Sequence, residues 1–329
     1  MCIARKNLIN LNKTKYYHCS SRIVRRSFLC GYDSKTCKNY DYRRDWIINR
    51  IRLLSRHFAI EVCAYAIMAN HYHLVLKVNL SEGIRMTQDE VIKRWTAIHP
   101  SKEELKHIYD SKGNIKDSPQ VKKIIRTWKR RLLSISWYMS ALNYNIARRA
   151  NKEDGCKGHF WEGRFSSQPL VGEASLLNCM AYVDLNPIRA GIASNLMECY
   201  YTSVRERIQA FIAAKNKVMN VVKVKGVKKL QNQLANSINY QPANLSAFYA
   251  NASFSALDYL KLVDLKGRQA RVDKKGYIRN DNEPIVYKLG VSNSIWDKLQ
   301  LHCKDSDISI LFDSRTINVR CTNISSLVH

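Results

Sequence analysis

Two histidines stand two residues apart in the segment HYHLVLKV, at positions 71 and 73. The residue types of 71–78 predict a strand, and side chains two apart on a strand project from the same face. His71 and His73 could therefore hold one divalent metal ion together, while Tyr72 points the other way. Because an HxH triplet is short, two ordinary histidines on an exposed sheet face remain an alternative at this stage.

A second pair of residues could supply a nucleophile and a further ligand. Tyr182 and Asn186 are four apart in a predicted helix over 173–186, which should end at Asn186 because Pro187 disfavours helical geometry at the residue before it. A metal and a desolvated site can make a tyrosine hydroxyl nucleophilic by stabilising charge as its bond to phosphate forms. The Asn186 carbonyl oxygen would complete a site suited to Mg²⁺ or Mn²⁺. A core tyrosine and an ordinary helix-ending asparagine are the alternatives.

The elements that must position these residues form a mixed pattern. Hydrophobic spacing and β-branched or aromatic content predict strands over 16–24, 59–68, 71–78 and 164–170, with a hairpin turn at 69–70. Helical spacing predicts helices over 41–58, 121–150, 204–217, 256–265 and 292–303. Short strands interleaved with helices favour an α+β fold, with an antiparallel sheet and helices on one face.

The charge points to a polyanionic partner. The chain has 54 Lys and Arg against 27 Asp and Glu, a formal net charge of +27. Such an excess usually accompanies a nucleic acid, although solvated surface charge is the plainer explanation. Residues 151–200, which contain Tyr182, invert the trend with four basic and six acidic side chains.

Other sequence features exclude several classes of protein. No apolar run is long enough for a transmembrane helix, and the first residues lack the pattern of a secretory signal. The 10 cysteines form no CxxC pair, which argues against a zinc ribbon or a secreted disulfide scaffold. We expect reduced thiols in a cytoplasm and no membrane partner.

Six residues are candidates for contact with a nucleic acid. Arginines near the end of the first strand could contact phosphates, and an aromatic residue beside an arginine could clamp unpaired bases. Each is equally open to a structural interpretation as solvated arginine or core aromatic. The candidates are Arg22, Arg25, Arg26, Trp161, Arg164 and Arg189.

Three motifs in order give a resemblance to a known family. The segments AYAIMANHYHLVLKV, GHFWEGRFSSQPL and MAYVDLNPIRAGI resemble those of the REP-associated tyrosine transposases, bacterial relatives of the small HUH single-strand transposases. YYHCSSRIVRRSFL resembles the family's first strand, and the resemblance covers roughly residues 15–210. It implies a ferredoxin-like antiparallel sheet, metal binding by His71 and His73 with Asn186, and Tyr182 as the nucleophile.

The resemblance also implies an activity and a partner. Tyr182 would attack a DNA phosphodiester at hairpin-forming, REP-like DNA, leaving a 5′-phosphotyrosine and a free 3′-hydroxyl that allow strand rejoining. The expected cofactor is Mg²⁺ or Mn²⁺, the expected partner single-stranded or hairpin DNA, and the expected location bacterial cytoplasm near the nucleoid. The oligomeric state stays open between monomer and homodimer.

The sequence also departs from the smallest family members. We predict a catalytic domain over 1–215 with a helical insertion at about 85–150, and a basic accessory region over 216–329 with a linker near 221–229. Three rival functions remain: a non-catalytic regulator that binds hairpin DNA or RNA on the same fold, a metal-dependent hydrolase that uses water, and a structural basic protein.

Overall fold

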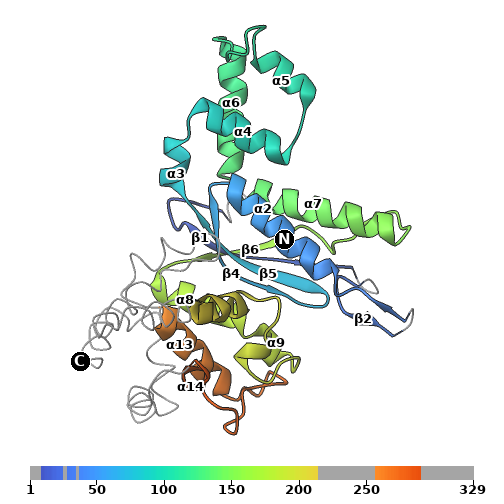
Figure 1. Cartoon of the computed structure of the whole chain (residues 1–329), viewed down its shortest axis with the longest axis vertical. Coiled ribbons are helices and arrows are strands. Elements are labelled where there is room, and N and C mark those ends of the chain that lie inside the picture. Colours follow the sequence, from blue (N-terminus) through green and yellow to red (C-terminus); the bar gives the residue numbers. More distant parts are fainter. Residues whose placement is uncertain (1–8, 25–27, 35–36, 214–255, 290–329) are drawn as a thin grey trace, which may run out of the picture. The chain divides into compact units, whose positions relative to one another are not determined.

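The sheet that carries the candidate site has four antiparallel strands. The computed structural model describes residues 9–24, 28–34, 37–213 and 256–289 (Figure 1). The strands are β1 (Tyr16–Arg22), β4 (Ile60–Ile67), β5 (His71–Val78) and β6 (Ser166–Leu170), in the spatial order β4-β5-β1-β6. A second, two-stranded sheet pairs β2 (Tyr32–Asp33) with β3 (Lys38–Asn39).

The succession of elements along the chain is ferredoxin-like. Helix α2 (Arg43–His57) follows β1, and helix α7 (Ile135–Glu153) lies between β5 and β6. The order β1-α2-β4-β5-α7-β6, with β1 between β5 and β6 in the sheet, is the β-α-β-β-α-β pattern of that fold. The two helices pack side by side (Figure 1). The predicted α+β class with an antiparallel sheet is confirmed.

The burial of β4 explains why the hairpin is so apolar. All eight residues of β4 are buried, and β5 is buried except at its first residue and at Lys77. A strand covered on both faces reads as a continuous apolar run rather than an alternating one. His71 is therefore placed at the start of a strand that otherwise belongs to the core.

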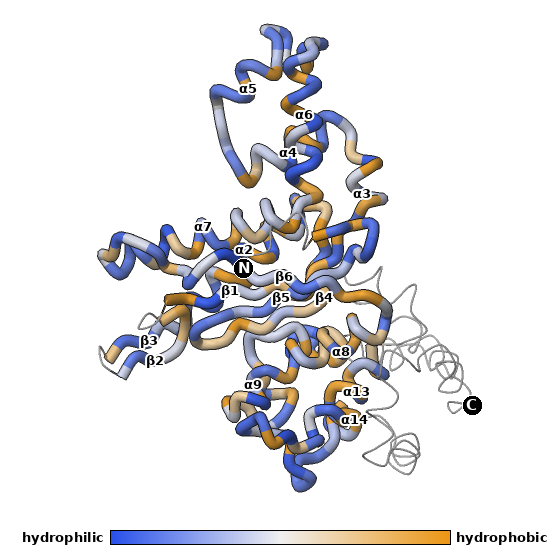
Figure 2. The backbone as a smooth tube through the Cα atoms, turned by 180° about the vertical axis from the view of Figure 1, so that it is seen from behind, coloured by the Kyte–Doolittle hydropathy of each residue, from blue (hydrophilic) through white to orange (hydrophobic). Residues whose placement is uncertain are grey.

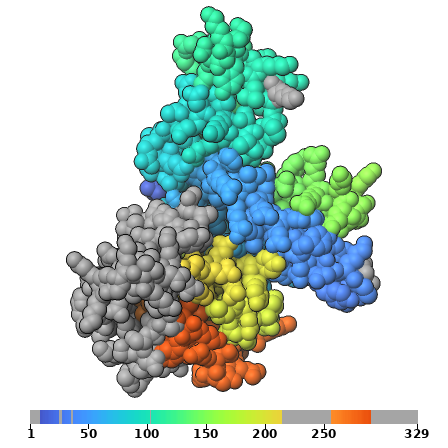
Figure 3. Space-filling view, viewed as in Figure 1, coloured from blue at the N-terminus to red at the C-terminus, as the bar shows by residue number. Residues whose placement is uncertain are grey.

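Four helices lie between β5 and α7. They are α3 (Leu80–Arg85), α4 (Gln88–Ile98), α5 (Lys102–Ile108) and α6 (Pro119–Leu132). Helices α4 and α6 pack together, and their Trp95 and Trp128 rings stack with centroids 6.0 Å apart. Hydrophobic residues are interspersed with hydrophilic ones along this segment (Figure 2). Figure 3 shows the surface of the same segment in cyan to green.

The prediction of one long helix over 121–150 is wrong. Helix α6 ends at Leu132, and α7 begins at Ile135 after Ser134, whose hydroxyl accepts from the Trp137 N–H at the start of the new helix. A serine side chain that caps a helix competes with the continuous helical ladder, so it breaks the run. Since α7 belongs to the ferredoxin-like succession, the chain outside that succession is α3–α6, residues 80–132.

The remaining elements form a second compact unit. Residue contacts place α2–α7 in one unit and α8 onward in the other, with parts of β4 and β5 in each. The second unit contains α8 (Glu173–Asp184), α9 (Asn186–Arg189), the short 3₁₀ helix Leu196–Glu198, a helix over 203–213, α13 (Ala256–Arg268) and α14 (Ile285–Lys288). Helix α13 packs against α8 and α14.

Part of the predicted C-terminal region can be compared with the structure. Helix α13 contains the predicted helix over 256–265. The predicted linker over 221–229 and the helix over 292–303 lie outside the described residues, so the boundary at 215 and the accessory role stay predictions. Among the described helices, none is long and apolar enough to cross a membrane.

Candidate active site

His71, the first residue of β5, is held as a neutral ring. Its Nδ1 lies 2.6 Å from Asn70 Oδ1. Burial, together with the positive charge of Arg22, lowers the pKa of His71 from 6.5 to about 4. The imidazole is therefore uncharged at neutral pH, and an Nδ1–H donated to Asn70 assigns the lone pair to Nε2. A neutral imidazole oriented through its other nitrogen is the form that binds a metal.

His73 lies against Tyr182. The side chain of His73 is only 8% exposed, whereas Tyr72 before it is fully buried. The His73 and Tyr182 rings meet edge to face, with centroids 5.7 Å apart and an interplanar angle of 76°. The structure thus brings together two of the residues that the sequence predicts for one site, from segments more than a hundred residues apart.

Tyr182 is an accessible residue between buried neighbours on α8. Its side chain is 40% exposed, while Ala181 and Val183 on either side are buried. The alternative of a core tyrosine does not fit this exposure. A nucleophile that attacks a large substrate must be accessible, and the exposure of Tyr182 is compatible with that role.

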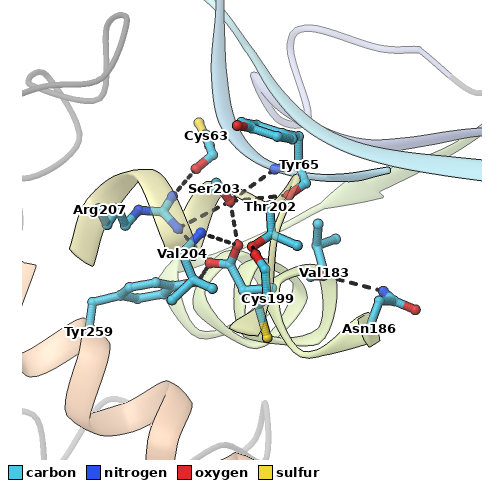
Figure 4. Close-up of polar contacts among 11 residues, drawn as sticks. Cys63, Tyr65, Val183, Asn186, Cys199, Thr202, Ser203, Val204, Arg207 and Tyr259 are labelled. Atoms are coloured by element: carbon cyan, nitrogen blue, oxygen red, sulfur yellow. Dashed lines mark hydrogen bonds and ion pairs between the residues drawn. The ribbon is translucent and has the colours of Figure 1, made fainter. Parts of the chain in front are cut away.

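Asn186 follows the end of α8 rather than lying within it. The helix ends at Asp184, two residues earlier than predicted, and Asn186 opens α9 ahead of Pro187. The Asn186 Nδ2 donates to the Tyr182 carbonyl at 3.1 Å and to the Val183 carbonyl at 3.5 Å. With the amide nitrogen turned back to the helix, the Oδ1 atom points away from it (Figure 4).

The donor set fits a divalent ion with open positions. Among the described residues there is no group of three or more His, Cys, Asp and Glu side chains that could hold a metal. Two imidazoles and one amide oxygen would leave positions for water or phosphate oxygens. Metal binding by His71, His73 and Asn186, and the choice of metal, stay predictions.

A buried charge network fixes the helix that carries Tyr182. Asp184 is fully buried, and its carboxylate accepts from the Ser203 hydroxyl, from the Val204 N–H at 2.9 Å and from the Tyr259 hydroxyl at 2.6 Å. The Arg207 guanidinium, 5% exposed, forms an ion pair with the same carboxylate (Figure 4). Four donors around one carboxylate satisfy a charge that would otherwise be costly to bury.

The same network reaches three further elements. Arg207 also donates to the Cys63 carbonyl on β4, and the Ser203 hydroxyl accepts from the Tyr65 N–H at 3.0 Å. Tyr259 comes from α13, and its ring lies under the Arg207 guanidinium at 4.7 Å. The C-terminal end of α8 is therefore bonded to β4, to the helix over 203–213 and to α13. This fixes the backbone two residues from Tyr182.

The sequence did not predict this role for Asp184. Geometry on a helix places it away from Tyr182, and the structure agrees with that placement. Its partners lie between 19 and 75 residues away in the sequence, and no local pattern marks them as partners. The one signal was an acidic residue inside an apolar helix, which must find donors when it is buried.

Arg22 and Trp161 are neighbours near the start of the GHFWEGRF motif. Arg22 is exposed, and its carbonyl accepts from the Glu162 N–H at 2.8 Å. Trp161 is half-buried, pairs with Ile23 in a β-bridge, and donates its Nε1–H to the Asn143 carbonyl at 2.9 Å. The indole is thus oriented by the protein while part of its surface stays accessible, which is compatible with base stacking.

The other predicted nucleic-acid contacts differ in their surroundings. Arg164 is exposed, whereas Phe165 beside it is buried and belongs to the core. Arg25 and Arg26 lie outside the described residues. Arg189 donates to the carbonyls of Gln269 and Lys266, at 2.7 and 2.5 Å, so its guanidinium holds the end of α13. Contact of any of these with a nucleic acid stays a prediction.

Comparison with known proteins gives one distant likeness. No family model and no curated protein matches the chain. Among solved structures the chain is similar to one described as a REP-associated tyrosine transposase bound to a REP hairpin, at 13% sequence identity and a TM-score of 0.34. The alignment covers 64% of this chain and 86% of that chain.

Proposed function

We propose that this protein is a metal-dependent enzyme that nicks and rejoins single-stranded DNA at hairpins, with Tyr182 as the nucleophile. The observation that supports it most is the contact between the exposed Tyr182 ring and the buried His73 ring, at 5.7 Å. Phosphoryl transfer on a polyanion is the chemistry that suits these features together. They are a histidine pair at the start of a strand, an accessible tyrosine and a net charge of +27.

The reaction proposed is a transesterification. The Tyr182 Oη attacks the scissile phosphorus as its proton is lost, and the bond from phosphorus to the 3′ oxygen breaks. The 3′ oxygen takes up a proton and leaves as a hydroxyl, while the 5′ phosphate stays on the tyrosine. One diester replaces another, so a second 3′-hydroxyl can reverse the step without ATP.

Each part of the candidate site has a place in this reaction. His71, His73 and the Asn186 oxygen would hold Mg²⁺ or Mn²⁺, which supplies stabilisation of the charge on the phosphate. The Asp184 network would hold the Tyr182 backbone still during attack, and this positioning avoids the loss of rate that follows from misplacement. Arg22 and Trp161 would contact the unpaired strand.

The test uses hairpin DNA with single-stranded flanks and a label at its 3′ end, because the downstream fragment is the one that stays on the protein. Wild type is compared with Tyr182→Phe, and with Tyr144→Phe as a control tyrosine that is 65% exposed on α7. With Mg²⁺ or Mn²⁺ we expect a labelled protein band on a denaturing gel for wild type and Tyr144→Phe, and none for Tyr182→Phe or in EDTA.

The rival functions predict other results. Binding without any covalent band would support a regulator that does not cleave. A cleaved strand without attached protein, still formed by Tyr182→Phe, would support a hydrolase that uses water. His73→Asn should remove the covalent band while Tyr182 is intact, and a band of undiminished strength in that variant would contradict the metal role of the histidine pair.

A further inference from the structure

Helix α6 in the insertion separates its apolar and basic residues onto adjacent faces. Val121, Ile125, Trp128 and Leu132 are buried and recur at helical spacing. At 3.6 residues per turn, five cations fall within an arc of about 120° beside that stripe. They are Lys122, Lys123, Arg126, Lys129 and Arg130.

The cations on this face have few acidic partners. Among the ion pairs in the described part of the chain, only Lys122 of the five takes part, paired with the exposed Asp117. Arg126 donates to the Lys122 carbonyl and Arg130 to the Thr127 hydroxyl, both within α6 itself. Positive charge is thus concentrated on this face and only slightly neutralised, which is typical of a surface that binds a polyanion.

Lys129 serves a different purpose on the same face. Its Nζ donates to the carbonyls of Ile84 and Met86, each at 3.0 Å, at the end of α3. This contact holds α6 against the segment between α3 and α4. These two hydrogen bonds fix the cationic face of α6 against the end of α3. The other lysines and arginines extend from that face.

Two hollows flank this face of α6. One is lined by Met86, Thr87, Gln88, Val91, Lys122, Ile125, Arg126 and Lys129. The other is lined by Pro119, Lys123, Arg126, Thr127, Lys129, Arg130 and Leu133. Arg126 and Lys129 border both hollows, so the charge lies along a ridge between two depressions.

We propose that this ridge binds the sugar–phosphate backbone of double-stranded DNA, such as a hairpin stem. Cations about one helical turn apart are spaced by about 5.4 Å, so Lys123, Arg126 and Arg130 can contact successive phosphates along one strand. Sites for unpaired strands combine cations with stacking aromatics. Neither hollow is lined by an aromatic residue. This contrast favours a duplex and a sequence-independent contact.

The proposal rests on the proposed DNA substrate but not on cleavage. The experiment measures binding of the full chain in EDTA to a blunt DNA hairpin over a series of salt concentrations. The variant combines Lys123→Gln, Arg126→Gln and Arg130→Gln. Its matched control combines Lys93→Gln, Lys106→Gln and Lys112→Gln, which removes the same charge from exposed positions elsewhere in the insertion.

We expect the slope of log affinity against log salt to fall by about 2.7 in the variant, since each lost phosphate contact removes about 0.9. The control should keep the slope, and Arg126→Lys alone should keep it too, because the charge remains. An unchanged slope in the triple variant, or an equal loss in the control, would overturn the proposal.

Two further measurements separate this site from the catalytic one. Affinity for a single strand without a stem should hardly change in the triple variant, and an equal loss there would overturn the assignment to duplex DNA. The covalent band on a short single strand should persist in the variant. If wild type forms no such band while the duplex effect is seen, the proposed cleavage fails and the α6 site stands.

Discussion

Replacing Asp184 with asparagine tests whether the tyrosine helix is held by a buried ion pair. The substitution keeps the side-chain shape but removes the charge opposite Arg207, and it puts an NH₂ group where four donors now converge. The Arg207 side chain is 3% exposed and the Asp184 side chain 0%. The remaining guanidinium would therefore be a buried charge without its counterion.

The size of the effect follows from that burial. Removing one partner of a buried pair lowers the free energy of unfolding by about 3–5 kcal/mol. The total free energy of unfolding of a domain is typically about 5–15 kcal/mol. Asp154→Asn is the matched control: its carboxylate is 26% exposed, and its partner Arg43 keeps a second carboxylate, that of Glu153. A partly exposed pair contributes about 1 kcal/mol or less.

Urea unfolding followed by circular dichroism gives the comparison. At a slope of about 1–3 kcal/mol per molar urea, Asp184→Asn should lower the midpoint by roughly 1 M or more, and Asp154→Asn by much less. The covalent band should weaken in Asp184→Asn even where the protein is still folded, because Tyr182 loses its fixed backbone. A midpoint within error of wild type would refute the reasoning that this pair is desolvated and essential to the helix.

Three other predictions concern residues of the second unit, Lys266, Gly276 and Arg189. Burial, with Arg189 and Arg271 nearby, lowers the pKa of Lys266 from 10.5 to about 8. Between those two values the unfolded chain binds more protons than the folded chain. The free energy of unfolding should therefore rise as pH increases through that range. Urea midpoints from pH 7 to 10 should show the rise in wild type and not in Lys266→Met. Gly276→Ala would press a Cβ against the Ile188 carbonyl oxygen and should lower the melting temperature, whereas Gly83→Ala meets only the end of the Leu133 side chain and should do so less. Arg189→Ala should lower stability by about 1.5–3 kcal/mol while DNA affinity holds, and lost affinity at unchanged stability would restore the arginine as a DNA contact.

The sequence predicted the elements that have strong local patterns. Strand β5 begins and ends where its alternation and apolar run indicate, and the Tyr182 helix begins at Glu173 as expected. The pairing of His71 with His73 on one strand needs only the geometry of a strand. These features depend on neighbours in the chain, so a single sequence contains them.

What the sequence could not give depends on one local helix cap and on contacts between distant residues. The break between α6 and α7 depends on one serine cap, Ser134, inside a run whose apolar spacing continues on both sides. Asp184 finds Arg207 and Tyr259 only in the folded chain. Arg189 was a candidate for DNA contact because it lies just past the tyrosine helix, and the structure shows it bonded to carbonyls at the end of α13.

The separation of Tyr182 from Asp184 has an evolutionary consequence. In the proposed reaction the exposed tyrosine would contribute the chemistry, while the buried aspartate two residues on holds the helix in the fold. Because Tyr182 is 40% exposed, its loss should leave the fold intact, so a descendant could keep the domain and its DNA surfaces after one substitution at this position. Under the proposed function, one substitution at Tyr182 would convert an enzyme that cuts DNA into a protein that only binds it, whereas a substitution at Asp184 would destabilise the domain first.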